Sequence, residues 1–122
     1  MLFRSDLTRV LIVDLPDDPT ATRAQALWAY EQALRFADCG AALLWLEDVA
    51  NLRLRRLQLA AEAGDTWGIL FRPERCAAQF SPALLRLALE PALARAGSAA
   101  ALRVTVRKAR GANAGTHCLL EL

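Results

Sequence analysis

The strongest pattern along the chain is the apolar run AALLWL, Ala41–Leu46, which ends at the carboxylates Glu47 and Asp48. A short apolar run between a glycine and two charges is typical of a strand buried on both faces. Two similar runs, VLIVDL (Val10–Leu15) and WGILF (Trp67–Phe71), predict strands before and after it. The chain therefore contains three candidate strands of a parallel sheet.

Apolar residues between these runs recur at helical spacing. The first helix is predicted to begin near Thr20 or Thr22, either of which is a suitable cap, and to end at Gly40. The second is predicted over Asn51–Ala63 and ends at Gly64. Helices alternating with strands favour parallel βα units, in which ligands bind at the carboxyl ends of the strands.

The spacing changes to period two in the last third of the chain. Apolar and polar residues alternate along Leu84–Glu90 and Leu102–Arg107, and His117–Leu122 forms a last short run. Small residues connect the first two runs, over Pro91–Ala100. We expect an α/β fold with a β-α-β-α-β partial sheet followed by an antiparallel β extension.

Composition narrows the class of protein. The chain has 122 residues, 55 % of them hydrophobic, and a formal net charge of +2, which is too small to argue for nucleic-acid binding alone. No apolar run approaches the ~20 residues that cross a membrane, and charged residues interrupt any signal-peptide pattern. The three cysteines lack metal-ligand spacing, so we expect reduced thiols in a cytoplasmic protein.

Catalytic signals are weak. The chain has neither a phosphate-binding G-x-x-x-x-G-K-[ST] loop nor a G-x-G-x-x-G motif, and its one histidine, His117, is expected to be a structural strand residue. Glu47 and Asp14 are candidates for a carboxylate pair at neighbouring strand ends, as acid-base or Mg²⁺ chemistry requires. Capping of the second helix by Asp48 is the favoured alternative. We therefore expect no enzyme activity, no cofactor and no metal.

Basic residues gather on the second helix and on the last hairpin. Their simplest role is a solvated face, and the alternative is contact with DNA phosphates or an acidic partner. Trp28, at the solvent-exposed edge of the first predicted helix, is either a rim residue or a protein-contact anchor. The candidate contact residues are Trp28, Arg53, Arg56, Arg107, Lys108 and Arg110.

Three segments in this order resemble the later half of RecA-like ATPases. A helix of the type EQALRFADCG leads into an apolar strand followed by EDVANL (Glu47–Leu52), and VTVRKAR resembles a V-x-V-x-K-x-K hairpin. The resemblance places Glu47 at the Walker B acid, and Lys108 and Arg110 at the paired basic residues. The third strand instead ends in Phe71-Arg72-Pro73, a departure from the polar sensor of those enzymes.

The chain is more similar to the ImuA family, degenerate RecA relatives associated with translesion DNA synthesis. The similarity lies in ALWAYEQALRFADCGAALLWL, LRRLQLAAEAG, LFRPER and SPALLRLALEP. It implies that residues 10–122 are the C-terminal part of a RecA-like domain. The residues before them begin without periodicity, so we separately expect residues 1–9 to be a disordered or non-native start. The similarity also implies a non-catalytic adaptor of the SOS response to DNA damage, with Glu47 as a remnant.

The resemblance implies three partners: a Y-family-like ImuB protein, an error-prone replicative-type polymerase and RecA. Direct DNA contact is left open. One alternative is a SulA-like inhibitor of cell division that binds FtsZ. Another is a fragment of a RecA-like ATPase whose phosphate loop lies upstream. Each reading leaves a truncated sheet, so we expect an exposed edge and an exposed apolar face.

Overall fold

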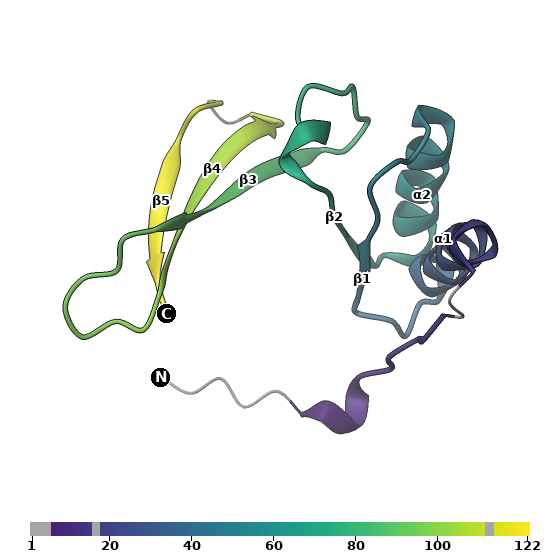
Figure 1. The fold of residues 1–122 in the computed structure, drawn as a ribbon. Coiled ribbons are helices and arrows are strands. Elements are labelled where there is room, and N and C mark those ends of the chain that lie inside the picture. Colours follow the sequence, from purple (N-terminus) through teal and green to yellow (C-terminus); the bar gives the residue numbers. More distant parts are fainter. Residues whose placement is uncertain (1–5, 16–17, 112–113) are drawn as a thin grey trace.

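The computed structural model describes residues 6–15, 18–111 and 114–122, and it has a mixed α/β fold with two helices, one parallel sheet and one antiparallel sheet (Figure 1). None of the helices in these ranges is both long and apolar enough to cross a bilayer. The elements, in chain order, are η1 (Leu7–Arg9), α1 (Pro19–Arg35), β1 (Ala41–Trp45), α2 (Asn51–Gly64), β2 (Trp67–Phe71), η2 (Glu74–Cys76), β3 (Leu85–Ala92), β4 (Ala101–Ala109) and β5 (His117–Glu121).

The first half of the fold is an α/β unit. Strands β1 and β2 pair in parallel, with Ala41 opposite Trp67 and Trp45 opposite Phe71. Both helices cover the same face of this pair, and the hydrophobic core lies between them and the strands (Figure 1). The core residues are Tyr30, Leu34, Ala42, Leu57 and Ala60. The bounds predicted for β2 are confirmed, and β1 ends one residue earlier than predicted.

Helix α1 begins and ends at different residues from those predicted. Its N-cap is Asp18, whose carboxylate accepts hydrogen bonds from the backbone N–H of Thr20 at 3.0 Å and of Ala21 at 3.5 Å. A carboxylate caps a helix well because it satisfies free N–H groups, so neither threonine is needed as the cap. The helix ends at Arg35, and the chain leaves it before reaching Gly40.

Gly64, the last residue of helix α2, has a packing role that the stop-signal interpretation missed. A Cβ added there would lie 1.9 Å from the carbonyl oxygen of Leu34, so the glycine allows the two helices to approach closely. The left-handed residue is instead Asp65, with φ 51°. At the other end the cap position is Ala50, without a side-chain hydrogen bond, and the predicted capping role of Asp48 is wrong.

The prediction that β1 is buried on both faces is wrong. Alternate residues of β1 and β2 point away from the helices and form a surface that we call the open face, with Trp45 68 % and Trp67 76 % exposed. A parallel strand is buried on both faces only where both carry a covering layer, and here both helices lie on one side. The open face consists of Leu43, Trp45, Trp67, Ile69 and Phe71.

The second half is an antiparallel sheet in the order β3-β4-β5, which extends away from the α/β unit (Figure 1). The prediction of three strands here is confirmed, with period two as the signal for β3 and β4. Leu87 lies opposite Val106, Leu89 opposite Val104, and a register shift follows Arg86. No helix covers either face of this sheet in the described part of the chain, so its apolar side chains stay partly exposed.

The first predicted strand, Val10–Leu15, does not form. The segment follows η1 as an unpaired stretch, with Leu11 87 % and Ile12 77 % exposed, so β-α-β-α-β is corrected to α-β-α-β. An apolar run becomes a strand only when another strand satisfies its backbone groups. Within one copy of the chain, this segment lies apart from the free edge of β1 (Figure 1).

Candidate interaction surfaces

Glu47 follows β1 and has a structural partner. Its carboxylate forms an ion pair with Arg75 of η2, and its carbonyl oxygen accepts a hydrogen bond from Arg72 Nε at 3.0 Å. The alternative in which Glu47 pairs with Asp14 is not seen, since Asp14 lies in the unpaired segment before α1 rather than at a strand end. These contacts hold the loop after β2 against the end of β1.

The same loop connects the two halves of the fold. Arg86 at the start of β3 donates from Nη2 to the carbonyl oxygen of Ala77 at 2.9 Å and from Nη1 to that of Gln79 at 3.1 Å. Arg107 of β4 forms an ion pair with Glu74 of η2, at 3.0 Å. Arg107 therefore helps to hold the sheet in place, although the sequence suggested it as a partner or DNA contact.

A groove of about 640 Å³ lies beside the open face. Its apolar walls come from Trp45, Phe71, Leu87 and Leu89, so the open face and β3 border the same groove. The rings of Trp45 and Phe71 stack with centroids 4.8 Å apart and planes 9° apart. Offset or parallel stacking fixes aromatic rings, so this surface is preorganised. We call it the apolar groove.

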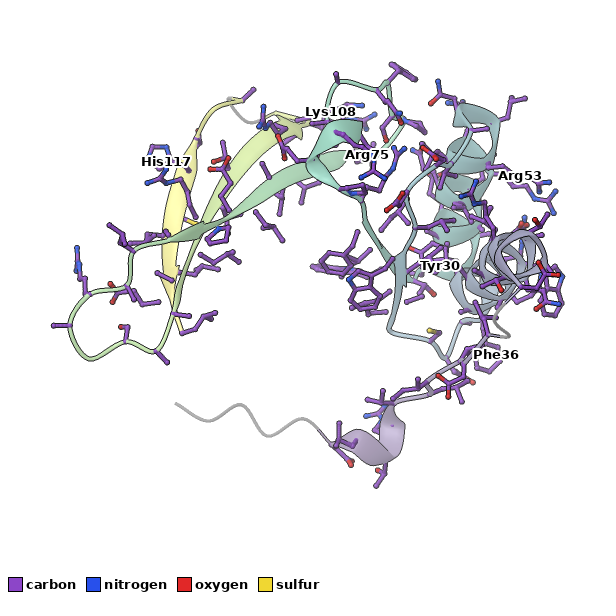
Figure 2. The ribbon with its side chains drawn as sticks, in the orientation of Figure 1. Tyr30, Phe36, Arg53, Arg75, Lys108 and His117 are labelled. Carbon is purple, nitrogen blue, oxygen red and sulfur yellow. The ribbon has the colours of Figure 1, made fainter. Side chains whose placement is uncertain are left out.

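A second groove, of about 560 Å³, lies between α2 and the end of β4. The groove is lined by Arg55 of α2, Lys108 of β4, Arg110 directly after β4 and the ring of Phe80. Lys108 Nζ donates to the carbonyl oxygen of Ser81 at 2.9 Å and lies 6.0 Å from the centroid of Phe80. Lys108 lies near the end of β4 that faces the α/β unit (Figure 2). We call this the basic groove.

The other candidate contact residues lie elsewhere. Arg53 points away from the core on the outer side of α2 (Figure 2), and Trp28 of α1 is 65 % exposed. Arg56 Nε lies 2.8 Å from the buried carboxylate of Glu31, which Arg35 also contacts at 3.1 Å. These contacts lower the pKa of Glu31, the hydrogen bond from Arg56 being the largest cause. Arg56 is therefore a structural residue that links α1 to α2.

Sequence reasoning missed two features of these surfaces. The period-two alternation of Trp67, Ile69 and Phe71, with Leu43 and Trp45 beside them, could have indicated one shared aromatic face. The meeting of Arg55 with Lys108 and Phe80 had no such signal, because it depends on how the loop before β3 packs. An aromatic ring thus lies beside the basic hairpin, although none is interleaved there in the sequence.

Comparisons of the chain with protein-family models, with curated proteins and with solved structures found no significant match.

Proposed function

We propose that this protein is an interaction protein whose partner binds at the open face and the apolar groove. The observation that carries the proposal is the exposure of Trp45 and Trp67 beside a groove of defined shape. Contiguous exposed apolar surface typically marks an interaction site, and tryptophan is enriched among the residues that dominate binding energies. The stacked Trp45 and Phe71 rings lose little freedom when a partner covers them.

The finer proposal follows the resemblance to the ImuA family. We propose a RecA-like arrangement and a non-catalytic role in SOS-type translesion synthesis. The partners are then a Y-family-like ImuB protein, an error-prone replicative-type polymerase and RecA. The ion pair of Glu47 with Arg75 supports the interpretation of Glu47 as a remnant, because this contact engages the carboxylate at the Walker B-like position.

Co-purification tests this proposal. The chain, carrying an affinity tag, is expected to retain the Y-family-like protein when the two are produced together, with the polymerase and RecA assayed separately. If the chain retains none of these three proteins, the translesion role is contradicted. Cell filamentation on overproduction, with no such association, favours the SulA-like alternative.

A specific observation favours a second candidate function, binding of single-stranded nucleic acid in the basic groove. Arg55, Lys108 and Arg110 place three cations around one groove, and the ring of Phe80 is 71 % exposed there. Cations that contact phosphates and aromatic rings that stack on bases are the usual components of single-strand sites. The two functions use different surfaces, so one protein can perform both.

Fluorescence anisotropy with a labelled single strand of DNA, measured over a salt series, tests this second function. Replacing Lys108 and Arg110 with alanine should weaken binding and reduce the slope of log K against log salt by about 0.7 per lost phosphate contact. The control replaces Arg53, an exposed cation on the outer side of α2, and should leave the slope nearly unchanged. Equal losses in both variants would contradict a localised site.

A further inference from the structure

The segment Val10–Leu15 has the composition of a strand, but no other strand pairs with it. Val10 has φ −106° and ψ 121°, in the β region, and the side chains of Val10–Val13 are all more than half exposed. The N–H of Val10 donates to the carbonyl oxygen of Leu7 at 3.2 Å, and no strand pairs with the rest of this apolar stretch, which is aggregation-prone unless another strand pairs with it. The segment therefore has the properties of a strand that pairs outside this copy's own sheet.

The parallel sheet has a free edge of matching character. The bond from the N–H of Trp67 to the carbonyl oxygen of Gly40 shows that even-numbered residues of β1 direct their backbone groups toward β2. By alternation, the backbone N–H and C=O groups of Leu43 and Trp45 point to the opposite edge. No strand pairs with that edge within the described residues.

The sequence that connects the segment to α1 is short and rich in proline. Two prolines, Pro16 and Pro19, stand in the four residues after Leu15. A proline holds the preceding residue in an extended conformation, and Asp18 has φ −81° and ψ 109° accordingly. The segment lies away from β1 of its own copy (Figure 1). A donor strand and an acceptor edge that do not meet in one copy can satisfy each other in two.

We propose that two copies of this chain form a dimer by reciprocal exchange of the strand Val10–Leu15, which pairs with the free edge of β1 in the other copy. Residues Leu11, Val13 and Leu15 then share one face, and Val10, Ile12 and Asp14 the other. The wholly apolar face lies on the helix side, and the face with Asp14 continues the open face. The inference is independent of the proposed function.

The mass of the full chain in solution is the first test. Light scattering at roughly 100 µM should give twice the chain mass of 13.3 kDa, since association depends on protomer concentration. Val13→Asp should yield a monomer, because the variant places a charge on the wholly apolar, helix-side face of the exchanged strand. Leu93→Asp, at a site 96 % exposed between β3 and β4, is the matched control and should remain dimeric.

A monomer for the unaltered chain, or a dimer that Val13→Asp leaves intact, would overturn the proposal. Equal dissociation by Leu93→Asp would also overturn it.

Cross-linking then identifies the partners in the dimer. One chain carries Ile12→Cys, and a second, tagged chain carries Leu43→Cys; in both, the accessible Cys39 and Cys118 are replaced with serine. A short flexible bis-maleimide should join the tagged chain to the untagged one. When both new cysteines are in the same chain, a product linked only within that chain would show docking on its own sheet and would contradict the exchange.

Discussion

The two halves of this fold differ in how their sheets are covered. In the α/β unit, α1 and α2 bury one face of β1 and β2, and Leu34 is only 1 % exposed. The β3-β4-β5 sheet has more strands, but Leu87 and Leu89 remain nearly half exposed. The pairing of strands therefore does not by itself form a hydrophobic core. A second layer has to exclude water from the apolar face.

The two halves meet at the loop after β2. Arg86 and Arg107 of the antiparallel sheet bind groups in the loop after β2, so polar contacts help to hold the sheet in place. Exposed ion pairs contribute little to stability, typically up to ~1 kcal/mol. We therefore expect the α/β unit to carry most of the free energy of unfolding.

The largest expected difference between the halves comes from truncating a leucine in each. Leu34→Ala removes a fully buried side chain of the α1–α2 core and should lower the free energy of unfolding by about 2–5 kcal/mol. Leu89→Ala, at a half-exposed position of β3, should lower it by about 1 kcal/mol or less. Urea denaturation followed by circular dichroism measures both, and similar losses would contradict the proposed division.

The contact between the two helices is tested by adding one methyl group. Gly64→Ala places a Cβ against the backbone of Leu34 and should cost about 1–3 kcal/mol of stability, because backbone yields less than a side chain. Gly40→Ala is the control: nothing lies within 4 Å of the added atom. A Gly64→Ala protein that melts at the temperature of the Gly40→Ala protein would show that the helices do not pack this closely.

The buried carboxylate between the helices should produce a smaller, pH-dependent effect. Glu31→Gln removes contacts with Arg56 and Arg35 and should cost about 1 kcal/mol at neutral pH. The pKa of Glu31 is lowered on folding, so its contribution is complete above the ordinary value of 4.5 and is lost as the pH falls through the lowered pKa.

Urea denaturation of the unaltered chain and of Glu31→Gln at several pH values measures how the difference in their stability changes with pH. Glu62→Gln, at an exposed position of α2, is the control and should behave as the unaltered chain does. If the stability lost in Glu31→Gln is as large in acid as at neutral pH, the ion pairs of Glu31 do not stabilise the fold.

The smallest effect is spectroscopic. Burial raises the pKa of Tyr30, the only tyrosine in the sequence, to about 12. The neutral phenol therefore favours the folded state fully below the ordinary value of 10.0, and this contribution is lost as the pH rises through about 12. Phenolate absorbance should titrate near 12 in the folded chain, and a midpoint near 10 would place Tyr30 in solvent.

Local pattern predicted much of the fold. Period two predicted β3 and β4, and helical spacing placed Leu54 and Leu57 of α2 against the sheet. The sequence failed where the outcome depends on a neighbour. Val10–Leu15 has the pattern of a strand, but whether it pairs depends on a free edge elsewhere, which no local pattern encodes.

The candidate sites were less predictable for the same reason. Arg56 and Arg107 were chosen as exposed cations, and each has an acidic partner far away in sequence, Glu31 and Glu74. Lys108 and Arg110 do line a groove, but the groove also needs Phe80 from a loop without periodicity. A charge in the sequence shows what a side chain offers, and tertiary packing decides whether it is already bound.

Calorimetry of the proposed Y-family-like partner with surface variants of this chain tests the central claim most directly. Trp67→Arg changes the open face, and Trp28→Arg changes an indole on α1 that is also mostly exposed. We predict that Trp67→Arg weakens the affinity at least tenfold, about 1.4 kcal/mol, and that Trp28→Arg leaves it nearly unchanged. Loss of binding in Trp28→Arg alone would contradict the account and assign the contact to the helix side.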